Sequence, residues 1–251
     1  MSTQPALPPV LYEDEHLLAL DKPAGLLVCP DRWDKGLANL ADLVHQRLSP
    51  DYFNAHRLDR GTSGVVLFAK SRPALQLLHE MFETRRVRKT YLALVRPAPA
   101  DDRGQIQAPI LPHPRCHGRM TIGRPGDLPA SPGATCRTDY EVLERWRGGL
   151  ALVRCFPRAG RTHQIRVHLM HLGSPVLADD LYGDGAPLLL SQIKRGYKPG
   201  DRPESPLIAR LALHAESLAL DHPTTGLPLT IQALLPRDFE IALKNLRKYG
   251  R

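Results

Sequence analysis

The chain has 251 residues, of which 42% are hydrophobic, and this excludes an intrinsically disordered protein. Lysine and arginine total 34 against 26 aspartate and glutamate, and the formal net charge of +8 indicates an anionic partner, either nucleic acid or a membrane surface. No apolar run is long enough to span a bilayer, residues 1–9 do not resemble a signal peptide, and the four cysteines form no CxxC pair. We therefore expect a cytoplasmic protein with free thiols.

Apolar spacing predicts the elements of the first half of the chain. Leu37, Leu40, Val44 and Leu48 recur at helical spacing, which predicts an amphipathic helix that Pro50 ends. A later apolar run rich in β-branched residues predicts a buried strand. The expected elements are strands at residues 10–12, 17–20 and 65–69 and helices at residues 37–48 and 73–84, the last with Leu75, Leu78 and Phe82 on one face.

The second half of the chain predicts more strands than helices. Gly173 follows the apolar positions Ile165, Leu169 and Leu172 and is expected to end their helix. Runs of strands broken by occasional helices predict an α+β fold with a mostly antiparallel mixed sheet, formed by a single domain over residues 1–251. The expected elements are strands at residues 89–95, 137–143, 150–156, 207–220 and 229–234, two short strands and a long loop between residues 95 and 137, a surface loop at residues 183–206, and helices at residues 162–172 and around residues 239–248.

The feature most typical of an active site is a turn that carries one acid between two arginines. Residues 56–64 read His-Arg-Leu-Asp-Arg-Gly-Thr-Ser-Gly, so Asp59 lies between Arg57 and Arg60, just before the strand predicted at residues 65–69. Two neighbouring cations favour an ionised carboxylate, and such a carboxylate can act as a covalent nucleophile. From these residues alone, a surface ion pair formed by Asp59 is the commoner alternative.

The same turn resembles the signature of the RluA family of RNA pseudouridine synthases, His-Arg-Leu-Asp-Arg-x-Thr-Ser-Gly. The resemblance extends from Val10 to about Pro236, although Ala178 stands where the family frequently has glycine. Further family motifs follow in the family's order: Lys-Pro-Ala-Gly at residues 22–25, Arg-Lys-Thr-Tyr-Leu at residues 88–92, Arg-Thr-His-Gln-Ile-Arg at residues 161–166, Asp-Asp-Leu-Tyr-Gly at residues 179–183 and Leu-His-Ala-Glu at residues 213–216.

The resemblance implies a catalytic domain of the pseudouridine synthase type, without an S4-type RNA-binding domain before it. It implies an enzyme that isomerises specific uridines in rRNA or tRNA to pseudouridine. The reaction breaks the glycosidic bond, rotates the base and rejoins it through carbon, so it needs no redox change, and we expect no metal and no cofactor. Asp59 is implied as the nucleophile, attacking either the base or the sugar of a uridine flipped out of the RNA.

Three further residues are implied to line the site. The ring of Tyr91 can stack on an extruded base, although spacing alone favours a core tyrosine. Arg161 is implied to pair with Asp59 and keep it charged and aimed, with a surface arginine that binds phosphate as the alternative. Ile165 can form an apolar wall for the uracil, and ordinary core packing is equally compatible with its position.

Several basic residues are candidates for RNA binding. Arg57 could occupy the gap that a flipped uridine leaves in the RNA stack, and His56 and Arg60 could contact RNA beside it; support of the loop is the alternative role. The densest basic group is expected to bind phosphates, with a solvated helix end as the alternative. This group, the 85–89 cluster, consists of Arg85, Arg86, Arg88 and Lys89.

Other chemistries fit the sequence less well. His163, His168 and His171 are not completed by a carboxylate or cysteine into a convincing metal site. Ser63 is not expected to be a hydrolase nucleophile, because the chain has no Gly-x-Ser-x-Gly motif and no evident His/Asp partnership. The alternative function is a catalytically inactive RNA-binding or ribosome-assembly factor on the same fold. We expect a monomer that binds RNA and no membrane.

Overall fold

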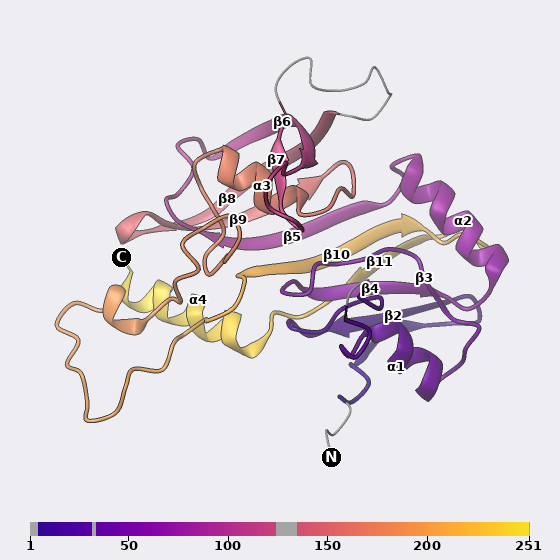
Figure 1. The fold of residues 1–251 in the computed structure, drawn as a ribbon, viewed down its shortest axis with the longest axis horizontal. Coiled ribbons are helices and arrows are strands. Elements are labelled where there is room, and N and C mark those ends of the chain that lie inside the picture. Colours follow the sequence, from indigo (N-terminus) through magenta and orange to yellow (C-terminus); the bar gives the residue numbers. More distant parts are fainter. Residues whose placement is uncertain (1–4, 32–33, 124–134, 251) are drawn as a thin grey trace. The chain divides into compact units, whose positions relative to one another are not determined.

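The computed structural model describes residues 5–31, 34–123 and 135–250, and the chain divides into two compact units that alternate along the sequence (Figure 1). The first unit contains Met1–Lys89 and His214–Leu234, and the second contains Thr90–Leu213 and Leu235–Arg251. The single domain expected over residues 1–251 stays a prediction.

The first unit contains a mixed set of strands. All of its strand pairs are antiparallel apart from β4 with β10, which run parallel, so the late strand β10 lies beside the early strand β4 (Figure 1). The strands are β1 (Val10–Glu13), β2 (Leu17–Lys22), β4 (Ser63–Ala69) and β10 (Leu213–Asp221) in order across the sheet, with β3 (Phe53–Asn54) paired to β4 and β11 (Pro228–Gln232) paired to β10.

One hydrophobic cluster of the first unit packs helix α2 against these strands. Every residue of β4 is buried, as the continuous apolar run predicts. Helix α2 (Arg72–Glu83) begins after Ser71, whose hydroxyl accepts a backbone N–H of the first turn. Its Leu78 is buried in the core, and Leu75 and Phe82 pack against the same cluster. The predicted second helix and its apolar face are therefore confirmed.

The helix predicted at residues 37–48 begins later than predicted. Helix α1 spans Leu40–Arg47, because the side chain of Asn39 accepts the backbone N–H of Asp42 at 2.9 Å and caps the first turn. Leu37 lies outside the helix, so its assignment to the helical face is wrong.

The second unit contains antiparallel strands. The strands predicted at residues 89–95, 137–143 and 150–156 are confirmed as β5, β8 and β9. The two strands predicted between residues 95 and 137 are β6 and β7, although β6 is longer than predicted, and residues 124–134 lie outside the described part of the chain. The order is β5 (Arg88–Val95), β9 (Leu150–Pro157), β8 (Thr135–Trp146), β6 (Arg103–Pro112) and β7 (Met120–Ile122).

Helix α3 (Gln164–His171) packs against β6, β7, β8 and β9. Ile165 and Leu169 are buried, and Gly173, with a φ of 81°, follows the helix, as predicted. Leu172 was expected to belong to this helix with Ile165 and Leu169, but it is 36% exposed. That expectation is wrong because the helix ends one residue earlier, and Leu172 is its C-cap.

The remaining elements complete the second unit. Helix α4 (Arg237–Tyr249) is the predicted closing helix, and it buries Phe239, Leu243 and Leu246. The strand predicted at residues 207–220 begins only with β10, since Ile208 forms no more than an isolated bridge. Short 3-10 turns occur at η1 (Arg147–Gly149) and η2 (Leu190–Gln192). Within the described residues, four helices with mostly antiparallel strands confirm the α+β class, and none of these helices is long and apolar enough to cross a membrane.

Candidate active site

Asp59 lies on the loop that leads into β4, as predicted. Its side chain is half-buried, and its carbonyl accepts the backbone N–H of Thr62 at 3.1 Å, which closes a tight turn. The turn ends at Gly64, which has a φ of 112°. A Cβ at Gly64 would lie 2.2 Å from the carbonyl oxygen of Ala215 on β10, so only glycine permits the two parallel strands to approach here.

A fully buried lysine holds this loop through hydrogen bonds to main-chain carbonyls. Lys22 is 0% exposed, and its ammonium group donates to the carbonyls of Pro23 at 2.9 Å, Leu26 at 2.8 Å and Arg60 at 3.3 Å. The carbonyl of Arg60 also accepts the N–H of Gly25 at 2.8 Å, and Arg60 Nε donates to the carbonyl of Gly25 at 3.0 Å. The loop at residues 23–26 is thereby tied to the residue that follows the proposed nucleophile.

His56, predicted to contact RNA, is bonded to the sheet. Its Nε2 accepts the backbone N–H of Leu67 on β4 at 3.1 Å, so this nitrogen carries no proton. Burial, reinforced by the charge of Lys89, lowers the pKa of His56 to about 3 and keeps the ring neutral. These contacts favour the alternative role, support of the loop, while the neighbouring Arg57 is exposed.

The 85–89 cluster is not uniform. Arg85, Arg86 and Arg88 are all exposed, but Arg86 pairs with Glu80 at 2.6 Å. Lys89 is half-buried, and burial lowers its pKa to about 8. Arg85 and Arg88, which lie outside the ion pair of Arg86 with Glu80, are thus the members best placed to meet a phosphate in solution.

Ser63 has a histidine partner that the sequence did not reveal. Its hydroxyl lies 3.0 Å from Nδ1 of His214 on β10, and Nε2 of His214 lies 3.3 Å from the carbonyl of Ala233. Nε2 therefore donates to that carbonyl, and Nδ1 accepts the hydroxyl proton. Both side chains are buried, and the third partner is a backbone carbonyl rather than a carboxylate. The pair joins β4 to β10 and offers no hydrolase site.

Tyr91, Arg161 and Ile165 belong to the second unit. Tyr91 is buried on β5, where its register partner is Cys155 of β9. Ile165 is buried in the first turn of α3. Arg161 is exposed on the turn that precedes this helix.

The turn of Arg161 is held by a glutamine that sequence reasoning did not single out. The backbone N–H of Arg161 donates to Oε1 of Gln164 at 3.2 Å, and the N–H of Gln164 donates to the carbonyl of Arg161 at 3.1 Å. Nε2 of Gln164 donates to the carbonyl of Arg137 and to the hydroxyl of Thr138. The Thr138 hydroxyl in turn lies 2.8 Å from Nδ1 of His168. The only sequence signal for this chain of contacts is the family motif itself.

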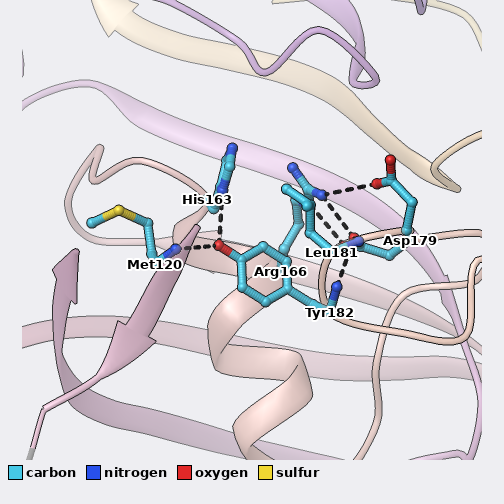
Figure 2. A network of polar contacts seen from close by, with 7 residues as sticks. Met120, His163, Arg166, Asp179, Leu181 and Tyr182 are labelled. Atoms are coloured by element: carbon cyan, nitrogen blue, oxygen red, sulfur yellow. Dashed lines mark hydrogen bonds and ion pairs between the residues drawn. The ribbon is translucent and has the colours of Figure 1, made fainter. Parts of the chain in front are cut away.

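A second network contacts His163, which lies in the same turn (Figure 2). His163 has a left-handed backbone, and its Nδ1 lies 2.8 Å from the hydroxyl of Tyr182. Arg166 forms a buried two-point ion pair with Asp179, with both N–O distances at 2.7 Å. Arg166 is therefore engaged internally, whereas Arg161 is exposed.

Within the described ranges, no three histidine, cysteine, aspartate or glutamate side chains converge as a metal site. The four cysteines, Cys29, Cys116, Cys136 and Cys155, form no disulfide with one another. The metal-free reaction and the cytoplasmic location stay predictions.

Comparison with known proteins identifies the family. A model of the RNA pseudouridylate synthase family matches residues 16–171. The chain belongs to the RNA pseudouridine synthases. Ribosomal large subunit pseudouridine synthase D of Xanthomonas campestris is 38% identical over 249 residues, which cover 95% of this synthase and 69% of the relative. Ribosomal large subunit pseudouridine synthase C of Salmonella typhi is 37% identical over 242 residues, with 95% and 70% covered.

A solved structure agrees with these relatives. Human RNA pseudouridylate synthase domain containing 4 superposes with a TM-score of 0.71 at 29% identity, covering 95% of this synthase and 92% of that chain. The resemblance to the RluA family, the pseudouridine synthase fold and the isomerase activity are thereby confirmed. The predicted site residues of the synthase are divided between its units. Asp59 belongs to the first, and Tyr91, Arg161 and Ile165 belong to the second. Their joint action is a proposal.

Proposed function

We propose that this synthase isomerises specific uridines of large-subunit rRNA, with Asp59 as the nucleophile acting on a uridine flipped out of the RNA. The observation that carries the proposal is the Asp59 turn, in which a half-buried carboxylate lies between two arginines on a loop fixed by buried Lys22. The names of the relatives, which are ribosomal large subunit pseudouridine synthases, favour rRNA over tRNA as the first substrate to test.

The isomerisation of uridine to pseudouridine needs a nucleophile such as this carboxylate. The bond between N1 of uracil and C1′ of ribose breaks, the base rotates, and C5 bonds to C1′ in its place. C5 loses a proton and N1 gains one, so substrate and product are isomers and no oxidant or reductant takes part. A carboxylate such as Asp59 can attack either the base or the sugar carbon and leave again when the new bond has formed.

In this proposal, residues of the second unit bind the uracil and orient the carboxylate of Asp59. Tyr91 stacks on the uracil and retains it while it is detached. Arg161 pairs with Asp59, because a planar guanidinium can fix a carboxylate through two hydrogen bonds. Ile165 forms an apolar wall, and Arg57 occupies the place that the uridine leaves in the RNA stack.

The RNA backbone binds to exposed arginines in this proposal. Arg85 and Arg88 are the stronger contacts of the 85–89 cluster, since Arg86 must first leave Glu80. Replacing Arg85 and Arg88 with alanine should weaken RNA binding and flatten the slope of log affinity against log salt by about 1.4 to 1.8. Arg86→Ala is the matched control and should change the slope less. Parallel plots for the double variant and wild type would place the RNA elsewhere, for example at exposed Arg115.

The proposed function is tested with RNA that carries tritium at C5 of uridine. Isomerisation releases the label to water, whereas binding alone does not. We expect release from a fragment of large-subunit rRNA, unchanged by chelation when the fragment folds without divalent ions. Release of tritium from tRNA but not from the rRNA fragment would mean that tRNA, and not rRNA, is the substrate. Release that chelation abolishes and zinc restores would contradict the metal-free mechanism. The predicted monomer and cytoplasmic location need separate measurements.

A further inference from the structure

Tyr182 joins two segments of the second unit that are far apart in the sequence. Its side-chain hydroxyl accepts the backbone N–H of Met120 at 2.7 Å and lies 2.8 Å from Nδ1 of His163 (Figure 2). Because Met120 is the donor in the first contact, the hydroxyl can give its one proton to Nδ1 in the second. We propose that Tyr182 is a positioning residue, which holds the turn at His163 in shape and thereby aims Arg161 in the chemical step. The inference rests on the proposed role of Arg161.

The turn at His163 needs such support. His163 has a φ of 56° and a ψ of 20°, a left-handed conformation that residues with a Cβ adopt only when their surroundings impose it. It lies two residues from Arg161, inside the turn that Gln164 closes. A change of backbone conformation at His163 would therefore redirect the guanidinium of Arg161. Strain of this kind is common at functional sites.

Tyr182 is itself firmly anchored. The carboxylate of Asp179 is 0% exposed and accepts the backbone N–H groups of Leu181 and Tyr182 as well as two N–H groups of Arg166. Arg166 also lies 5.0 Å from the centre of the Tyr182 ring. A buried ion pair adds little net stability but fixes geometry, and here it fixes the base of the tyrosine against α3.

The other contact of the hydroxyl leads to the hairpin formed by β6 and β7. Met120 begins β7, and the guanidinium of the preceding Arg119 lies 5.4 Å from the centre of the Tyr182 ring. The carbonyl of Arg119 accepts the N–H of His113, which closes a hairpin tip where Arg115 is exposed. Tyr182 therefore links a basic hairpin to the turn of Arg161.

Tyr182→Phe distinguishes the role of the hydroxyl from that of the ring, because it removes only the hydroxyl and keeps the packing and both cation–ring contacts. Tyr140→Phe is the matched control, since Tyr140 is another buried tyrosine of the second unit and lies outside this network. We expect Tyr182→Phe to slow tritium release roughly ten- to a hundredfold in single-turnover reactions with saturating enzyme, because small misplacements of an aiming group have effects of this size. RNA affinity and thermal stability should stay near those of the control.

A double-mutant cycle with Arg161→Lys tests whether Tyr182 acts through Arg161. If it does, Tyr182→Phe should slow an Arg161→Lys enzyme by no more than about threefold. Fully multiplicative effects would overturn the inference, as would a loss of RNA affinity with an unchanged rate. A normal rate in Tyr182→Phe beside a slow Arg161→Lys would contradict this inference alone. A normal rate in Arg161→Lys would also contradict the proposed role of Arg161.

His163→Asn provides a second route if Tyr182→Phe lowers the stability of the protein. Asparagine tolerates the left-handed conformation but lacks the ring nitrogen that meets Tyr182. The same slow step with unchanged RNA affinity is expected, and a wild-type rate in a folded His163→Asn enzyme would overturn the inference.

Discussion

The turn of Asp59 and the turn of Arg161 each present one charged side chain, yet they are held in different ways. The Asp59 loop is fixed by main-chain carbonyls gathered around the buried ammonium of Lys22 and by a strand contact that only Gly64 permits. The Arg161 turn is held by side chains, chiefly Gln164 and, through His163, Tyr182.

The difference indicates how each turn should respond to change. A single cation that serves three carbonyls has no substitute, so the first turn should fail as a whole when Lys22 is replaced. The contacts of the second turn are shared among several neutral and ionic groups, so their loss should be graded. We therefore expect single substitutions to disrupt the first turn completely and to change the geometry of the second turn only in part.

Replacing Lys22 should have the largest effect. Lys22→Met fills a similar volume but leaves the carbonyls of Pro23 and Leu26 without the ammonium donor, while the carbonyl of Arg60 keeps the N–H of Gly25. Each unsatisfied buried group costs about 1–3 kcal/mol. We expect the free energy of unfolding to fall by about 3 kcal/mol or more, measured by denaturant titration. Lys70→Met, which removes a partly exposed pair with Glu13, is the control and should cost less than about 1 kcal/mol. Equal losses would contradict the account of the Lys22 clamp.

Acid should weaken the support of the second turn. Burial lowers the pKa of His168 to about 4, and its ring accepts from Thr138 and donates to the carbonyl of Ala108. Between this pKa and the ordinary value near 6.5, the unfolded chain binds more protons, so stability present at pH 7 is lost as the pH falls. One such histidine contributes a slope of up to about 1.4 kcal/mol per pH unit.

The slope is measured by denaturant titration across pH 7 to 4.5. His168→Asn should remove the contribution of His168 to this slope. The contribution of His56, which is also neutral, should remain. An unchanged slope in His168→Asn would show that His168 does not titrate as proposed.

The smallest effect is expected at Ala178, next to the ion-pairing Asp179. Ala178 has a φ of 52°, a conformation that favours glycine, and the family frequently has glycine there. Ala178→Gly should stabilise the protein by about 0.5–1 kcal/mol in thermal unfolding. Ala93→Gly, in an ordinary buried strand, should destabilise it. A loss of stability in Ala178→Gly would mean that the network does not impose strain at this position.

Local patterns predicted much of the fold. The apolar run of β4, the amphipathic face of α2 and the stop at Gly173 follow from residues close in sequence, and the structure confirms them. The start of α1 was missed because the capping bond of Asn39 outweighs the apolar periodicity that included Leu37.

The candidate site was predicted only in part, because its supports are long-range. Lys22 and Arg60 are 38 residues apart, and Ser63 and His214 are 151 apart. No periodicity or composition joins such pairs, so the motifs could be quoted from the sequence while the contacts that connect them could not. Asp59 itself was found because the contiguous run of residues 56–64 resembles the family signature.

The most direct test of the account is the single-turnover rate of Asp59→Asn. Asparagine keeps the shape of the side chain but removes the negative charge that makes a carboxylate a nucleophile. The account predicts a variant with wild-type stability and RNA affinity that releases no tritium above background and leaves every uridine of the rRNA fragment unmodified. Appreciable turnover by a folded Asp59→Asn protein would contradict it.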